Sequence, residues 1–201
     1  MDTAAKYNGA LTAEQFLFFE MRIVSRMHCE GASLEEIIDA AKRGNLFQYP
    51  TERKIARMAR ACHRRLLALG SKKLIRAMAT APAPTAKQIN LYAMMRHYRL
   101  VREFMMDVVG EKYRTLDFSC TKMDINLFFS RLQEQDHDVA EWSDKTISKL
   151  KSVLKKCLVE TSMLDDARSA KLNPVLISAE LERGIRENHD LAALAAFNCF
   201  K

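Results

Sequence analysis

Residues 51–69, TERKIARMARACHRRLLAL, are the stretch that best defines the fold of this chain of 201 residues. At about 100° per residue, the apolar side chains of this stretch gather on one side, which predicts an amphipathic helix packed on a core. That apolar face comprises Ile55, Met58, Ala59, Cys62, Leu66 and Leu69. The opposite face carries Arg53, Arg57, Arg60 and Arg64, with Lys54 and Arg65 beside them. We call the four arginines of this face the arginine ridge.

The charge around the ridge is strongly one-sided. From Thr51 to Arg76 the chain has nine Lys and Arg and a single acid, Glu52. Like charges one helical turn apart repel by a few tenths of a kcal/mol each. Because no acids accompany the arginines, an external anion is the simplest compensation, and nucleic-acid phosphate is such an anion. A solvated helix face, or neutralisation by another part of the chain, is the alternative interpretation.

Two helices are predicted ahead of this one. The first spans residues 13–29 and begins at a capping box formed by Thr12 and Gln15. Its apolar stripe comprises Phe16, Phe19, Ile23 and Met27. A second capping box, Ser33 with Glu36, begins a short helix. A short second helix followed by a basic third helix is typical of a helix-turn-helix, in which the third helix enters the major groove of DNA.

A proline-containing segment follows the basic region. The sequence APAP at residues 81–84 predicts an extended linker and a domain boundary. Thr85 and Gln88 form a further capping box, which begins a long, mostly apolar helix that ends near Val109. Apolar residues surround most of that helix, so we expect it to be central and buried. The expected domains are therefore residues 1–80 and 85–201.

A second basic helix is predicted after Ser143, preceded by a helix over residues 122–133. Its inward face comprises Ile147, Leu150, Leu154 and Leu158. The candidate DNA-binding residues on its outward face are Lys145, Ser148, Lys149, Ser152 and Lys156, flanked by Lys151 and Lys155. Lysines and short hydroxyl side chains suit contacts to phosphate oxygens. A lysine-rich solvated face is the alternative interpretation.

A β-hairpin is predicted over residues 163–177. Short apolar pieces at 163–164 and 172–177 flank a polar stretch, which would place Arg168 and Lys171 at the tip. Helices followed by a hairpin, over about residues 121–178, resemble a winged helix whose tip touches DNA. The expected fold class is thus all-α, with a helix-turn-helix-like N-terminal unit, a winged-helix-like C-terminal unit and at most this one hairpin.

The composition predicts a basic, soluble protein. The chain holds 32 Lys and Arg against 25 Asp and Glu, a formal net charge of +7. Residues 1–85 have 14 basic and 8 acidic side chains, whereas residues 86–142 have 8 and 9. The longest uncharged stretches have ten residues, and a membrane span needs about 20. The five cysteines are scattered, which is typical of reduced thiols in a cytoplasmic protein.

Patterns that would indicate catalysis are not found in the sequence. Six glycines leave little room for a phosphate-binding glycine-rich loop, and the five histidines do not follow a metal-ligand spacing. The acidic pairs Glu35–Glu36 and Asp165–Asp166 suit a helix start and a turn. We therefore expect a binding protein that is not an enzyme and that has no cofactor and no metal.

Four segments together resemble the BrxA family, the small helical component of BREX bacteriophage-defence systems. They are LTAEQFLFFEMRIVSRMHCEGASLEEI (11–37), KIARMARACHRRLLAL (54–69), YRLVREFMMDVVGEKY (98–113) and WSDKTISKLKSVLKKCLVETSMLD (142–165). The resemblance implies an all-helical protein of two globular parts that binds double-stranded DNA. It also implies action alongside a methyltransferase, an ATPase and a phosphatase-like protein. It supplies no catalytic residues.

Two other functions remain open at this point. One is RNA binding, as in helical bacterial antitermination factors, which are basic bundles of similar size. The other is a protein–protein adaptor within the defence complex. Such an adaptor would use an apolar tail formed by Leu191, Leu194, Phe197 and Phe200.

Overall fold

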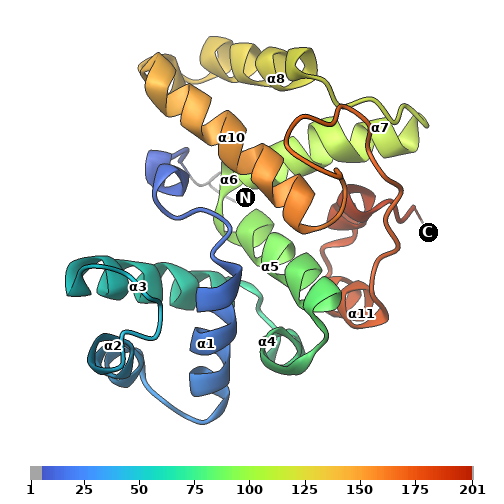
Figure 1. Ribbon diagram of the computed structural model, residues 1–201. Helices are drawn as coiled ribbons and strands as arrows, with labels where there is room; N and C mark the ends of the chain where they lie inside the picture. Colours follow the sequence, from blue (N-terminus) through green and yellow to red (C-terminus); the bar gives the residue numbers. More distant parts are fainter. Residues whose placement is uncertain (1–5, 201) are drawn as a thin grey trace. The chain divides into compact units, whose positions relative to one another are not determined.

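A computed structural model describes residues 6–200 of the chain (Figure 1). These residues form helices, and the strand-like pairing among them is one isolated antiparallel bridge between Ser119 and Lys171. The helices are η1 (Gly9–Thr12), α1 (Phe18–Cys29), α2 (Leu34–Arg43), α3 (Glu52–Ala68), α4 (Lys72–Thr80), α5 (Ala83–His97), α6 (Arg99–Glu103), η2 (Phe104–Gly110), α7 (Glu111–Arg114), α8 (Lys122–Gln135), α9 (His137–Ala140), α10 (Asp144–Glu160), α11 (Ala179–Glu187) and η3 (Leu191–Phe197). η1 and η3 are 3₁₀ helices and η2 is a π-helix. The expected all-α class is confirmed.

The chain forms two compact units, each assembled from separate segments. Of the described residues, one unit takes 17–97 and 178–188, and we call it the α3 unit. The other takes 6–16, 98–177 and 189–200, and we call it the α10 unit. These segments divide the chain differently from the expected domains at 1–80 and 85–201, which stay a prediction about independently folding parts.

In the α3 unit, the helix that defines the fold forms as expected. The hydroxyl of Thr51 accepts a hydrogen bond from the N–H of Lys54, so α3 begins at a capped end. Every residue of its predicted apolar face is buried, and Leu66 and Leu69 are 0 % exposed. The capping box of Ser33 and Glu36 also forms and begins α2. These parts of the sequence analysis are confirmed.

The first helix begins later than expected. α1 begins at Phe18, and Thr12 instead ends η1, where its hydroxyl donates to the carbonyl of Gly9 at 2.8 Å. Glu14 is buried and accepts a hydrogen bond from the hydroxyl of Tyr98, which holds its segment outside the helix. The predicted apolar stripe is therefore wrong, because Phe19 is 53 % exposed. The buried face of α1 carries Met21 and Val24.

The proline segment and the long helix after it also differ from expectation. Pro84 lies in the first turn of α5, where a residue without an N–H group is tolerated. Gln88 does not cap this helix; its side-chain oxygen accepts the N–H of Ser178 at 2.9 Å. The predicted buried character of α5 is confirmed, since residues 88–95 are all buried. The helix does not run on to Val109, because Tyr98 has extended backbone angles and ends it.

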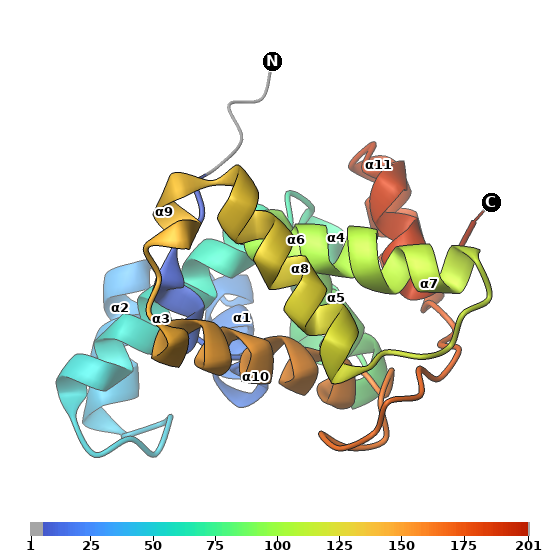
Figure 2. The same ribbon diagram turned by 90° about the horizontal axis from the view of Figure 1, so that it is seen from above.

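In the α10 unit, both predicted helices form, and Figure 2 shows the short α9 between α8 and α10. The hydroxyl of Ser143 accepts the N–H of Thr146 and begins α10 as expected. The predicted hairpin over 163–177 is wrong. No strand forms among its described residues: one backbone bond joins its two ends, from the N–H of Asn173 to the carbonyl of Met163 at 2.9 Å, and the N–H of Leu172 donates instead to the carbonyl of Phe118 at 2.7 Å. The winged-helix and helix-turn-helix assignments stay proposals.

Candidate nucleic-acid interface

The arginine ridge lies on the exposed face of α3. All four of its side chains are exposed, while the opposite face of the helix is buried in the α3 unit. Arg53 and Arg64 are eleven positions apart, which at about 1.5 Å per residue gives a ridge about 16 Å long. The packed face fixes the backbone of the helix that carries the ridge.

Three of the four arginines of the ridge have no acidic partner in the described part of the chain. Across residues 6–200, no Asp or Glu forms an ion pair with Arg53, Arg57 or Arg60. Glu52, the acid nearest in sequence, lies 3.8 Å from Lys42 instead. Lys54 is half-buried, with its Nζ atom 4.0 Å from the centre of the Tyr49 ring. That cation–π contact holds Lys54 at the edge of the ridge.

Arg65 does not belong to this surface. It is 0 % exposed, among the largest fully buried side chains of the described residues, so the expectation that it flanks the ridge is wrong. In helical projection it lies about 20° from Met58, and Met58 is part of the buried face. A guanidinium group buried to this extent is tolerated only with polar partners inside the protein, and Arg65 has such an interaction.

A second basic surface lies beside the first half of α10. A cleft of about 600 Å³ opens there. Its lining residues are Thr12, Ser143, Lys145, Thr146, Ser148, Lys149 and Ser152. We call this the α10 cleft. It combines two ammonium groups with five hydroxyls and is lined by no carboxylate, which is a chemistry that suits phosphate oxygens.

The α10 cleft brings together four of the residues predicted from the sequence: Lys145, Ser148, Lys149 and Ser152. Lys156 is exposed on the same helix but does not line the cleft. Arg168 and Lys171 are exposed in an irregular segment and not at a hairpin tip. The flanking lysines are held within the unit, since Lys151 donates to Asn126 at 2.8 Å and Lys155 to the carbonyl of Ala167 at 3.0 Å.

Three lining residues were not singled out as binding residues from the sequence: Thr12, Ser143 and Thr146. Thr12 comes from η1, which packs on α10 more than 130 positions away in sequence. No local pattern connects the two segments. Ser143 and Thr146 carry the helix cap, so their role as cleft lining is visible only in three dimensions.

Other kinds of site find less support in the described part of the chain. Residues 6–200 contain no group of three or more His, Cys, Asp or Glu placed to hold a metal ion. The rings of His28 and His63 lie 5.5 Å apart, and burial followed by the charge of His28 lowers the pKa of His63. No helix within residues 6–200 has the length and apolarity that crossing a bilayer requires.

Comparison with known proteins places the chain in a family. The family model described as BrxA matches residues 5–189. The chain belongs to the BrxA family. A "BREX protein BrxA" from Bacillus cereus (strain H3081.97) is 32 % identical over 181 residues, which cover 90 % of each chain. A second "BREX protein BrxA", from Paramagnetospirillum magneticum (strain ATCC 700264 / AMB-1), is 23 % identical and covers 85 % of each chain.

The fold of this BrxA family member also matches a solved structure. A crystal structure of an uncharacterized protein from Magnetospirillum magneticum superposes with a TM-score of 0.82. The match covers 96 % of this chain and 98 % of that one at 20 % sequence identity. This likeness shows a shared fold.

Proposed function

We propose that this BrxA family member acts in BREX phage defence by binding double-stranded DNA, chiefly through the phosphate backbone. One observation carries the proposal: an exposed ridge of four arginines stands on a helix whose other face is buried. Like charges one helical turn apart on the ridge repel one another in the free protein. Binding an anionic polymer relieves that repulsion and releases condensed counterions from the DNA.

The spacing of the ridge supports a polymer as the ligand. A single small anion would engage one or two guanidinium groups, whereas the ridge presents four along about 16 Å. Duplex DNA carries one negative charge per about 1.7 Å of its axis, so every arginine of the ridge can meet a phosphate. The α10 cleft supports a second phosphate contact, with Lys145 and Lys149 as its charged groups.

The chemistry of both surfaces favours low sequence specificity. Phosphate contacts position a protein on DNA but carry no direct information about base sequence. Arginine also reads guanine edges, so a mild preference is compatible with the proposal. A single site bound about 1,000-fold more tightly than random DNA, the lower range for specific binders, would contradict it.

The deciding experiment compares two double charge reversals in the α3 unit. Arg57→Glu with Arg60→Glu alters the ridge, and Lys72→Glu with Arg76→Glu makes the same charge change on exposed positions of α4. Fluorescence anisotropy with a duplex of random sequence gives affinity as a function of salt. We expect the ridge variant to bind weakly and its slope of log K against log[salt] to flatten by about 1.8, at about 0.9 per phosphate contact.

The same titration separates the competing functions. Equal losses in the ridge and α4 variants would indicate a response to net charge alone. No loss in either would exclude the ridge as the DNA contact, and no loss in the α10 cleft variant as well would refute the DNA-binding proposal. Tighter binding to duplex RNA than to DNA, measured in competition, would favour the RNA-binding alternative. Only part of the apolar tail expected to serve an adaptor is accessible to a partner. Leu194 and Phe197 are buried, whereas Leu191 and Phe200 are exposed.

A further inference from the structure

The exposed surface of α3 is only one residue wide. Among residues 52–68, all of which the structure describes, six are exposed: Glu52 in the first turn, the four arginines of the ridge, and Leu67. At about 100° per residue, the arginines and Leu67 fall within an arc of about 80°. Ala56 and Ala61 border this arc on its two sides, and they are 7 % and 0 % exposed. The arginine side chains therefore project from a helix whose flanks are covered.

The covered flanks bear on which groove of DNA the helix can meet. α3 packs against α1, α2 and α5 of the same unit. The major groove is about 12 Å wide, and an α-helix with its side chains is about 10–12 Å across. A helix that enters this groove meets a phosphate strand on each side, so its flanks must be free. The flanks of α3 are buried instead, and only its row of arginines stands clear.

The minor groove fits a single row of arginines. It is about 6 Å wide, which is too narrow for a helix but wide enough for extended side chains. Where the minor groove is narrowest its negative potential is enhanced, and this potential attracts inserted arginines. A guanidinium group is planar and more weakly hydrated than an ammonium group. It therefore loses less on leaving water for a confined groove.

The charge and length of the ridge agree with this placement. Arg57 and Arg60 lie at its centre, and no carboxylate among residues 6–200 forms an ion pair with either. In the minor groove a row of cations lies between the phosphates of both strands, so it is neutralised from two sides. The ridge is about 16 Å long, which corresponds to about five base pairs at 3.4 Å each.

We propose that the arginine ridge lies along the minor groove of duplex DNA over about five base pairs, with Arg57 and Arg60 directed into the groove. This inference rests on the proposed DNA binding and adds the groove and the feature of DNA that is recognised. It implies a mild preference for DNA whose minor groove is narrow and has no guanine 2-amino group. The helix-turn-helix expectation differs, because it places this helix in the major groove.

Base analogues that change one groove at a time test the inference on the full chain. Three duplexes share one sequence of about 15 base pairs, three times the expected site, and so carry equal phosphate charge. The first contains guanine. In the second, inosine replaces guanine, which removes the 2-amino donor from the minor groove and keeps the O6 and N7 acceptors of the major groove. In the third, 7-deazaguanine removes the N7 acceptor and leaves the minor groove unchanged.

Fluorescence anisotropy at one fixed salt concentration compares the three duplexes. We expect the inosine duplex to bind about fivefold more tightly than the guanine duplex, the lower end of what one base-pair change costs. The 7-deazaguanine duplex should bind as the guanine duplex does. Arg57→Lys with Arg60→Lys keeps both charges but should reduce the preference for inosine, because ammonium groups are more strongly hydrated. Arg43→Lys with Arg76→Lys makes the same change at exposed positions of α2 and α4 and should keep the preference.

The outcomes separate this inference from the proposed function. Equal binding of the inosine and guanine duplexes would overturn the inference and leave the proposed DNA binding in place. Weaker binding of the 7-deazaguanine duplex would also overturn it, because that result shows a contact in the major groove. An undiminished preference in the Arg57→Lys, Arg60→Lys variant would overturn the assignment to the ridge. If none of the duplexes binds at any salt concentration, the proposed function itself fails.

Discussion

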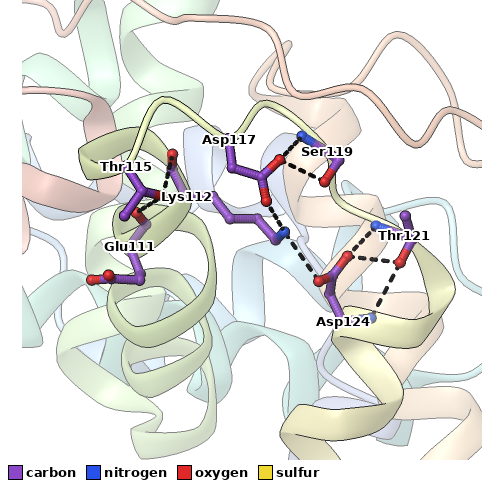
Figure 3. A network of polar contacts seen from close by, with 7 residues as sticks. All are labelled: Glu111, Lys112, Thr115, Asp117, Ser119, Thr121 and Asp124. Carbon is purple, nitrogen blue, oxygen red and sulfur yellow. Dashed lines mark hydrogen bonds and ion pairs between the residues drawn. The ribbon is translucent and has the colours of Figure 1, made fainter.

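The Nζ atom of Lys112 lies 3.0 Å from Oδ1 of Asp124, and this ion pair joins α7 to α8. The same ammonium group lies 2.8 Å from Asp117, and the Lys112 side chain is only 12 % exposed. Asp117 also accepts a hydrogen bond from Ser119, and Asp124 accepts one from Thr121 (Figure 3). One lysine thus neutralises two acids between α7 and α8, and its removal would leave both carboxylates without a countercharge.

The first prediction concerns the stability that this lysine supplies. Replacing Lys112 by Met keeps the length of the side chain and should lower the free energy of unfolding at pH 7 by about 1 kcal/mol, as for a partly exposed charged hydrogen bond. The bond from Lys112 is the main cause that lowers the pKa of Asp117. For Asp124, burial raises the pKa, and the bonds from Thr121 and Lys112 more than offset it.

The difference in the free energy of unfolding between wild type and Lys112→Met should depend on pH, and this dependence identifies its cause. Because both folded-state pKa values lie below the ordinary aspartate value of 3.8, the stabilisation is present above pH 3.8 and is lost as the pH falls through the folded values. Urea unfolding should therefore show a gap between wild type and Lys112→Met that closes in acid. A gap independent of pH would mean that packing, and not charge, is responsible.

The second prediction concerns Asp107, where removal of the charge should raise the free energy of unfolding instead of lowering it. Its folded-state pKa is raised, so the ionised carboxylate costs stability once the pH exceeds that value. Asp107→Asn should therefore unfold at higher urea than the wild type at pH 7, by about 0.5 kcal/mol, and the two should converge below the ordinary pKa of the carboxyl. Glu134→Gln removes the same charge at an exposed position of α8 and should not gain stability. A destabilised Asp107→Asn would show that the ionised carboxylate gains more from its surroundings than it loses by burial.

The third prediction concerns close packing in the α3 unit. A Cβ atom added at Gly184 on α11 would lie 2.5 Å from Cγ of Leu74, a side chain that is only 1 % exposed and cannot move away. Alanine in a helix interior is ordinarily better than glycine by about 1 kcal/mol. Here overpacking should outweigh that gain, and Gly184→Ala should lose about 1–3 kcal/mol.

A double mutant checks the cause of that loss. Leu74→Ala removes the obstructing atoms, so Gly184→Ala should become neutral or stabilising in the Leu74→Ala background. Thermal unfolding of the four proteins completes the cycle. Additive losses would show that the two side chains do not meet and that the packing of α11 on α4 differs from this structure.

The sequence predicts the parts of the fold that local patterns determine. α3 and α10 each carry an apolar face at helical spacing and a capping residue at the start, Thr51 and Ser143. Their exposed basic faces follow directly from that geometry. The lysines of the α10 cleft can be predicted for the same reason, because they lie on one face of a single helix.

The remaining features depend on contacts between distant residues. Glu14 is held by Tyr98, 84 positions later, and that contact keeps its segment out of α1. The segment expected to form a hairpin pairs with residues 118–120 because Leu172 finds a backbone acceptor on Phe118. The hollow of about 620 Å³ between α8 and the segment formed by α6, η2 and α7 combines a π-helix with a separate helix, and no pattern within a single helix indicates it.

The fourth prediction locates the DNA contact within the α10 unit. Lys145→Glu with Lys149→Glu alters both charged groups of the α10 cleft, while Lys156→Glu with Lys171→Glu makes an equal change on exposed positions outside it. If DNA phosphate occupies the cleft, the first pair should weaken duplex binding strongly and flatten the salt slope by about 1.8, at about 0.9 per phosphate contact. The second pair should have a smaller effect, because its lysines have no neighbouring cleft hydroxyls to help fix a phosphate. Anisotropy titrations at several salt concentrations give both quantities, and circular dichroism confirms that each variant is folded.

A larger loss with the second pair would move the contact to the C-terminal half of α10 and the loop after it, which is where a wing would lie. Unchanged affinity in both variants, together with a loss in the α3 ridge variant, would confine DNA binding to the α3 unit.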